Sequence, residues 1–192
     1  EVLVAHLGMS GQFKIQRENS EYESHLRANF QLSNGKEMRF IDQRTFGWLA
    51  VDLLEEGIPQ IVSHIARDPF DPEFDKRALV KQILKKRGQI KKVILDQEVV
   101  SGIGNIYADE ALWYARIHPE AIAEDLTSTQ ILNLVTAAQK VMQRALKAGG
   151  TSFDELYINV NGESGYFERS LAVYGQEGEP CRRRRSCGGE II

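Results

Sequence analysis

The hydrophobic periodicity of this chain changes at residues 67–75, and this change limits the possible folds more than any other feature. Before the segment, apolar and polar residues alternate with the period of two that strands show. After it, apolar residues recur every three or four positions, as in amphipathic helices. The segment itself, RDPFDPEFD, combines two prolines with several acidic residues and is typical of a linker. The sequence therefore predicts an α+β protein, with a β part at 1–66 and a helical part that begins at residue 76.

The β part is expected to contain three strand-forming stretches. Residues 2–16 read as strand, turn and strand, with GMSG as the turn, and WLAVDLL at 48–54 reads as a further strand. Between them, residues 28–42 predict a hairpin, because alternating apolar residues flank Asn34-Gly35, a pair typical of type I′ turns.

The helical part is predicted to contain helices at 76–87, 90–95, 105–115 and 128–147. The last has the clearest boundaries. Thr127 with Gln130 has the spacing of a capping box at its start, and Gly149-Gly150 is a typical helix end. After it, LAVYG at 171–175 predicts a short strand.

Composition indicates an ordinary globular chain: 42% of the 192 residues are hydrophobic and 27% are charged. No apolar run approaches the roughly 20 residues of a membrane span, and no signal peptide opens the chain. Because the sequence starts with strand-like alternation, we expect its N-terminus to be cut. Only two cysteines occur, Cys181 and Cys187, which favours a reducing compartment and a cytoplasmic location.

Positive charge is concentrated locally although the formal net charge is −3. Residues 76–95 contain eight lysines and arginines and no acidic residue, and Arg182–Arg185 form a second basic run. The field at a surface follows the local distribution of charge, so these runs favour a nucleic acid partner, although a solvated helix face is the simpler alternative.

The stretch SGIGN at 101–105 predicts a sharp turn just before a helix. Gly102 and Gly104 allow positive φ and close approach of another molecule, and the first amides of the following helix lack internal partners. Such amides, with the side-chain amide of Asn105 beside them, can bind a phosphate. The alternative is that the glycines only form the turn and Asn105 caps the helix. The local residues alone leave both readings open.

Four motifs in order resemble the bacterial formamidopyrimidine-DNA glycosylases. They are HLGMSG (6–11), DQRTFG (42–47), LDQEVVSGIGNIYADEALWYARIHP (95–119) and GGTSF…NGESGYF…VYGQEGEPC (149–181). The third resembles the family's helix–two-turn–helix signature. The resemblance runs from Val4 to about Cys181. It implies the C-terminal part of an N-terminal β-sandwich at 1–66, a linker at 67–75, a helix–two-turn–helix domain at 76–170 and a zinc-finger remnant at 171–192.

The resemblance also implies an activity. Family members excise oxidised purines, such as 8-oxoguanine and formamidopyrimidines, after flipping the damaged nucleotide out of the duplex. Three side chains fill the space that it leaves, and by motif position these are Met9, Arg44 and Phe46. Without the motifs, Met9 and Phe46 would read as core residues and Arg44 as a surface charge.

Further positions match residues with which the family holds DNA. His6, His25, Lys86 and Asn105 correspond to backbone contacts, and Tyr174 is a further candidate; such contacts position a duplex without reading its sequence. Residues 151–167, rich in glycine and asparagine around 159–167, resemble the loop that closes over the flipped base.

The chain departs from the family at both ends. The family uses an N-terminal proline as nucleophile, a glutamate beside it as acid, and an assisting lysine in the β-domain upstream of the HLGMSG strand. No residue here corresponds to any of them, and Glu1 is separated from HLGMSG only by VLVA. We therefore predict no catalytic residue in this chain and no activity for residues 1–192.

The C-terminus lacks the family's two C-x2-C pairs. Cys181 and Cys187, the only candidate metal ligands, are separated by RRRRS. The parent protein is expected to bind one structural zinc, but two thiolates cannot close a tetrahedral site, so we expect no well-formed zinc here.

The primary hypothesis is an end-truncated formamidopyrimidine-type DNA glycosylase and abasic-site lyase. It would be a monomer, associated with the nucleoid, whose partner is duplex DNA containing oxidised purines and not a membrane. Two alternatives remain: a homologue that binds damaged DNA without catalysis, and an endonuclease VIII-type glycosylase for oxidised pyrimidines.

Overall fold

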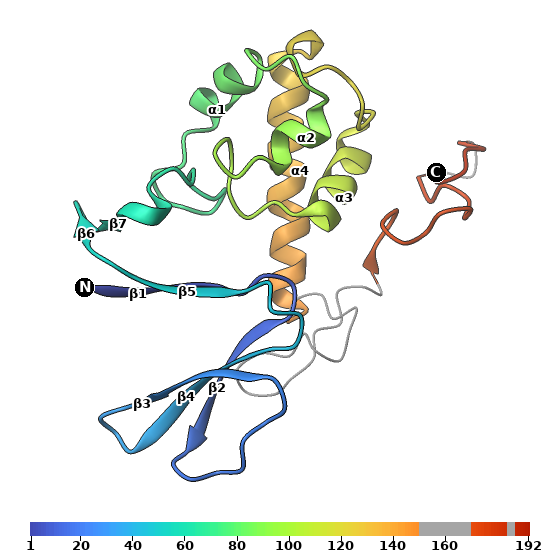
Figure 1. Ribbon diagram of the computed structural model, residues 1–192. Helices are drawn as coiled ribbons and strands as arrows, with labels where there is room; N and C mark the ends of the chain where they lie inside the picture. The colour runs from blue at the N-terminus through green and yellow to red at the C-terminus, as the bar shows by residue number, and fades with distance from the viewer. Residues whose placement is uncertain (150–169, 184–186) are drawn as a thin grey trace. The chain divides into compact units, whose positions relative to one another are not determined.

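The computed structural model describes residues 1–149, 170–183 and 187–192 (Figure 1). The chain divides into two compact units, which are described separately. The first comprises Glu1–Ser63 with Ala148–Glu168, and the second comprises His64–Lys147 with Arg169–Ile192. The described residues of the first unit form mainly strands and those of the second form mainly helices, which confirms the α+β class. The finer domain limits that the sequence suggests, with a linker at 67–75, stay predictions.

The first unit contains two antiparallel sheets and a short hairpin. β1 (Val2–His6) pairs with β5 (Trp48–Asp52), with His6 opposite Trp48. The second sheet has the order β2-β4-β3, formed by β2 (Gly11–Arg17), β3 (Leu26–Gln31) and β4 (Lys36–Asp42) (Figure 1). The strand–turn–strand unit, the hairpin and the strand near residue 48 are therefore confirmed.

The hairpin turn differs from the predicted type I′ geometry. Type I′ needs positive φ at both central residues, but only Gly35 of the pair has it, with φ 73°. The turn is instead closed by the Gly35 N–H, which donates to the Leu32 carbonyl at 3.0 Å, and by the Asn34 side chain, which accepts from the Lys36 N–H. Positive φ at two successive residues occurs at Glu56-Gly57, between β6 (Leu54–Glu55) and β7 (Ile58–Pro59), a hairpin that the sequence analysis missed.

The hydrophobic core of the first unit is small. Among its described hydrophobic residues only Phe40 and Ile41 are buried, whereas several large apolar side chains are exposed. These include Leu3, Val51, Leu53, Leu54 and Ile58. Much of the apolar surface of its described residues is therefore exposed.

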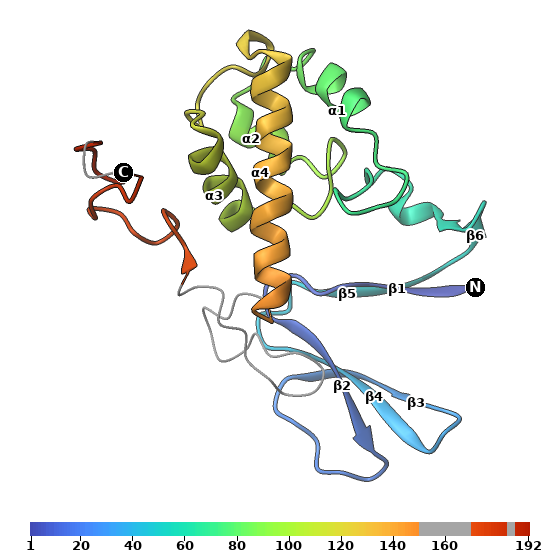
Figure 2. The same cartoon turned by 180° about the vertical axis from the view of Figure 1, so that it is seen from behind.

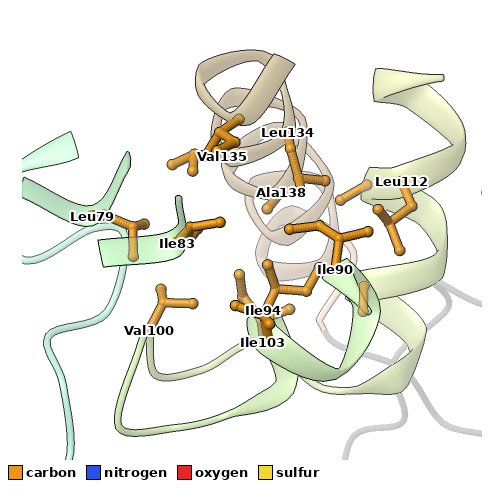
Figure 3. Close-up of a cluster of buried hydrophobic side chains, with 14 of the residues drawn as sticks. Leu79, Ile83, Ile90, Ile94, Val100, Ile103, Leu112, Leu134, Val135 and Ala138 are labelled. Carbon is orange, nitrogen blue, oxygen red and sulfur yellow. The ribbon is translucent and has the colours of Figure 1, made fainter. Parts of the chain in front are cut away.

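The second unit is built around one long helix, α4 (Ser128–Lys147), which passes beside the three shorter helices (Figures 1 and 2). These are α1 (Lys76–Ile83), α2 (Ile90–Leu95) and α3 (Asn105–Ala115). Leu134, Val135 and Ala138 of α4 face the apolar side chains of the other helices and of the loop before α3 (Figure 3). The helices at 105–115 and 128–147 have the predicted bounds.

The starts of α1 and α4 follow local capping chemistry. The Asp75 carboxylate accepts from the N–H groups of Arg77 and Ala78 at the start of α1. At the start of α4, the Gln130 N–H donates to Thr127 Oγ1 and the Thr127 N–H donates to Gln130 Oε1, so the predicted capping box is confirmed.

Two predicted elements are wrong in part or whole. α1 ends at Ile83, not at residue 87, because the N–H groups of Lys85 and Lys86 bond to carbonyls three residues back and tighten the chain into a turn. Residues 171–175 form a turn and not a strand, because their N–H groups bond to a side chain of α3 and not to another strand. None of the described helices has the length and apolar character needed to cross a membrane.

Candidate nucleic-acid interface

Two adjoining loops of the first unit present three of the predicted DNA-binding side chains. Met9 lies in the turn between β1 and β2, and Arg44 and Phe46 lie in the loop between β4 and β5. Met9 is 51% exposed and Phe46 is 56% exposed, so neither belongs to the core. The guanidinium carbon of Arg44 lies 5.1 Å from the centroid of the Phe46 ring, which pairs these two side chains at the surface.

The two loops touch through their backbones. A Cβ built on Gly8, which has φ +60°, would lie 2.7 Å from the carbonyl carbon of Phe46. A Cβ on Gly47 would lie 2.8 Å from the His6 carbonyl oxygen. Glycine is therefore required at both positions, because any side chain would push the Met9 turn away from the Arg44–Phe46 loop.

A buried carboxylate underlies these loops. Asp42 is 1% exposed; its Oδ1 accepts from Ser10 Oγ at 2.5 Å and its Oδ2 accepts from the Gly47 N–H at 2.8 Å. The Ser10 hydroxyl lowers the pKa of Asp42 below its ordinary value most strongly. Burial acts against it, and the N–H groups of Gly47, Thr45 and Arg44 lower the pKa further. Ser10 and Asp42 lie inside the motifs HLGMSG and DQRTFG, but their roles depend on contacts that local sequence does not reveal.

His6 is exposed beside the same turn. Its Nδ1 accepts from the Gly8 N–H at 3.1 Å, and its ring stacks on Trp48 with centroids 5.8 Å apart. In the neutral imidazole the proton therefore belongs on Nε2, which leaves a donor available to an outside acceptor. His25 is also exposed and has φ 67°, and its carbonyl accepts from the Asp42 N–H.

In the second unit, the turn before α3 is held by a residue that the sequence analysis missed. The Gln97 side chain accepts from the Gly102 N–H at 2.9 Å and donates to the carbonyls of Leu95 and Ile103. Gly102 has φ +81°, and a Cβ there would lie 3.3 Å from Met142 Cε, so glycine is required. Gln97 lies within the recognised signature, but its role depends on bonds that only the folded loop makes.

Gly104 and Asn105 form the start of α3. Gly104 is the N-cap, with φ −95° and ψ −179°, and a Cβ built on it would meet no atom within 4 Å. Neither its backbone conformation nor its packing against described residues requires glycine at this position. The absence of a side chain does leave the N–H groups at the start of α3 accessible. Asn105 is the first helical residue, so the reading of Asn105 as N-cap is wrong. Its exposed side chain makes no hydrogen bond with a described residue. The open start of α3, with the exposed Asn105 side chain beside it, is therefore suited to bind an anion.

The basic run at 76–95 is partly neutralised. Lys86 follows α1 and its Nζ lies 3.7 Å from Asp96 Oδ2, while its side chain stays 43% exposed. Lys91 pairs with Asp109 at 2.7 Å. Exposed Lys85 and Lys92 make no ion pair with the residues that the structure describes. Lys86 thus remains accessible to a phosphate, but only part of the run offers unpaired charge.

The first two arginines of the second basic run make contacts within the protein instead. Arg182 donates to the Leu171 carbonyl and to Gln176, and Arg183 donates to the Trp113 carbonyl and lies over the Trp113 ring. Arg184 and Arg185 lie outside the described residues, as does the predicted closing loop at 151–167. Tyr174 is half-buried in the turn that follows Leu171.

The two cysteines lie close together near the C-terminus. A Cβ built on Gly189 would be 3.6 Å from Cys187 Sγ and 3.9 Å from Cys181 Cβ. The pKa of the Cys181 thiol is lowered, first by the Arg183 backbone N–H and then by the Trp113 indole. Two thiols supply half of the ligands of a structural zinc, and the described ranges contain no group of three or more candidate ligands. The residues present therefore do not fit a closed zinc site.

Comparisons with known proteins agree with this geometry. Residues 1–49 match the family model described as the formamidopyrimidine-DNA glycosylase N-terminal domain, and residues 65–155 match that of the H2TH domain. The chain is 56% identical to the formamidopyrimidine-DNA glycosylase of Rhodococcus erythropolis, over 98% of this chain and 66% of the relative. It is 49% identical to that of Thermobifida fusca, over 100% of this chain and 68% of the relative.

Solved structures are similar as well. MutM in complex with carbocyclic 8-oxo-G containing DNA is 31% identical, with a TM-score of 0.80 over 98% of this chain and 67% of that one. A Lactococcus lactis FPG mutant in complex with Fapy-dG containing DNA is 29% identical, with a TM-score of 0.80 over 98% and 68%. The chain spans 66% of the length of the Rhodococcus erythropolis relative. Matches to both domain models, and about half of all residues shared with named relatives, show that the chain belongs to the formamidopyrimidine-DNA glycosylase family.

Proposed function

We propose that this chain forms the DNA-holding part of a glycosylase and abasic-site lyase that removes oxidised purines from duplex DNA. The observation that carries this proposal is the exposure of Met9, Arg44 and Phe46 on two interlocked loops of one unit. An exposed thioether, guanidinium and aromatic ring, held by loops that require glycine, suit entry into a stack from which a nucleotide has left. The relatives' names and the lesion-containing DNA in the similar structures support the same reading.

Each side chain has a proposed task. Met9 and Phe46 fill the vacated space by van der Waals contact and stacking, and Arg44 donates hydrogen bonds to the base left without its partner. His6 Nε2, Lys86 and the Asn105 amide hold phosphate oxygens, and His25 and Tyr174 are further candidate contacts. These contacts carry no sequence information, which suits a protein that must inspect all DNA.

The chemical step is proposed for the family's N-terminal proline, to which no residue of this chain corresponds. Its amine attacks C1′ of the damaged nucleotide, the base leaves, and the resulting Schiff base allows β- and δ-elimination of the phosphates. We therefore propose that residues 1–192 bind lesion-containing DNA and do not cleave it.

Two measurements test the proposal. Fluorescence anisotropy with duplexes containing 8-oxoguanine, an abasic-site analogue, thymine glycol or no lesion should give the tightest binding for the first two. Borohydride trapping on the 8-oxoguanine duplex should yield a covalent adduct only when a Pro-Glu N-terminal segment of the family is joined ahead of residue 1. Equal affinity for all four duplexes, or a fusion that neither traps nor excises, would contradict the proposal.

The same experiments decide between the alternatives. Preferential binding and excision of thymine glycol would favour an endonuclease VIII-type activity. Lesion binding by a native product that starts near Glu1, without trapping by the fusion, would favour a non-catalytic binder. Neither alternative has support from the names of the similar proteins.

Metal content and location are separate proposals. Because Cys181 and Cys187 supply only two ligands, we propose that residues 1–192 bind no structural zinc of their own, although a zinc is expected in the family. Zinc released on thiol modification should stay well below one equivalent, and one full equivalent would contradict this.

A monomer that works at the nucleoid remains the proposed state and place of action.

A further inference from the structure

Ser10 and Asp42 join the two loops that carry the predicted void-filling residues. Ser10 lies directly after Met9, and its Oγ donates to Asp42 Oδ1 at 2.5 Å. The same Ser10 oxygen accepts from the Arg44 N–H at 3.0 Å. Ser10 is 5% exposed and Asp42 is 1% exposed, so both groups are shielded from water and depend on each other for hydrogen bonds.

Asp42 also holds the far end of the Arg44–Phe46 loop. Its second oxygen accepts from the Gly47 N–H at 2.8 Å, so one carboxylate spans the loop from start to finish. Between these anchors Thr45 has φ 56°, a left-handed conformation that a β-branched residue rarely adopts. Such a conformation persists only where the surrounding bonds fix it, and here the Ser10–Asp42 pair supplies those bonds.

We propose that Ser10 and Asp42 are positioning residues for void filling. They hold Met9, Arg44 and Phe46 in a single arrangement before DNA binds, so that the three side chains enter the duplex together. The proposal rests on the proposed function. Because both residues are buried, they act only through the three exposed side chains.

The physical advantage is preorganisation. A loop that is already ordered loses little conformational entropy when its side chains enter the stack. Without the Ser10 hydroxyl, Asp42 Oδ1 and the Arg44 N–H lose a shared partner and the loop gains alternative conformations. Binding to undamaged DNA depends on phosphate contacts made by other residues, so it should be affected much less.

The test uses Ser10→Ala and Asp42→Asn in residues 1–192, each with a matched control. Ser20→Ala removes a hydroxyl that donates to the Arg17 carbonyl at 2.8 Å, and Asp52→Asn alters a carboxylate that accepts from the N–H groups of Leu53 and Ile61. Anisotropy would compare a duplex containing a tetrahydrofuran abasic site with an undamaged one over a range of salt. The fluorescence of 2-aminopurine opposite the abasic site would report entry of the side chains.

We expect both test variants to lower the preference for the abasic duplex about tenfold and to reduce the 2-aminopurine response. The affinity of the test variants for undamaged DNA, and its salt dependence, should match those of the wild type. The two control variants should match the wild type on both duplexes. In a Phe46→Ala background, Ser10→Ala should have a smaller effect, because part of its consequence passes through that ring.

Several results would overturn the inference. The first is a Ser10→Ala variant that keeps the wild-type preference for the abasic duplex. The second is an equal loss of affinity for the abasic and the undamaged duplex. The third is a loss of preference in the controls Ser20→Ala and Asp52→Asn as large as in the test variants. If Asp42→Asn does not fold by circular dichroism, Ser10→Ala decides alone, because it keeps the Asp42–Gly47 bond. A wild-type chain that shows no preference for the abasic duplex would instead refute the proposed function, and this inference with it.

Discussion

The carboxylate of Glu110 binds the backbone of Ala172, 62 residues further along the chain. Its two oxygens accept from the Ala172 N–H at 2.8 and 3.0 Å, and Oε1 also accepts from the N–H groups of Val173 and Tyr174. Glu110 is 1% exposed and lies on α3, the helix that begins with Asn105. One buried side chain thus fixes the segment that carries Tyr174 to the helix of the candidate phosphate site.

Replacing Glu110 by alanine should release this segment. The N–H groups of residues 172–174 would lose their acceptor, at a cost of about 1–3 kcal/mol. Limited trypsin digestion at Arg182 and Arg183 should become faster, and the urea midpoint should fall. Glu124→Gln, which alters an exposed carboxylate near Arg87, should leave both unchanged. Digestion at the wild-type rate would show that other contacts hold the segment.

Replacing Met9 or Phe46 by alanine should separate stability from lesion recognition. Both side chains are largely exposed, so each change should alter the free energy of unfolding by no more than about 0.5 kcal/mol. The preference for an abasic duplex over an undamaged one should nevertheless fall. Thermal unfolding and anisotropy check the two effects. A large loss of stability with unchanged preference would assign these residues to packing.

Gly104→Asp should weaken DNA binding without harming the fold. Aspartate is a good N-cap and a Cβ fits at this position, so stability should stay equal or rise. The added negative charge would face the phosphate that the helix start is proposed to bind. Gly104→Asn, which caps equally well without charge, is the matched control and should bind better than Gly104→Asp. Equal affinity of the two variants would place the phosphate elsewhere.

Lys86→Ala should reduce the salt dependence of DNA binding. One phosphate contact contributes about 0.9 to the slope of log affinity against log salt, so the slope should become shallower by about that amount. The salt titration should use undamaged duplex, with Lys140→Ala, an exposed lysine of α4, as the charge-matched control. An identical change in both variants would indicate a general charge effect.

Stability should depend on pH through Asp42. Its pKa is lowered in the folded state, chiefly by the Ser10 hydroxyl and against the effect of burial. The stabilisation is therefore fully present above the ordinary aspartate pKa of about 4 and is lost as the pH falls through the lower folded value. The difference in unfolding free energy between the wild type and Asp42→Asn should shrink from pH 7 to pH 3. A constant difference would exclude this linkage.

The sequence by itself determined the elements whose cause is local. The helices at 105–115 and 128–147 have the predicted bounds, because their periodicity and the Thr127–Gln130 box act within a few residues. The predicted turn at GMSG and the predicted helix start at residue 105 also agree with the positions of Met9 and Asn105. Local spacing determines these features because their hydrogen bonds and apolar faces join near neighbours in the chain.

Tertiary structure alone decided the features that distant residues create. LAVYG reads as a strand, but the Glu110 carboxylate binds its N–H groups and makes it a turn. The role of Ser10 appears only when Asp42, 32 residues away, is brought beside it. Local patterns carry no information about which buried donor will meet which acceptor, because those partners meet only after the chain has packed.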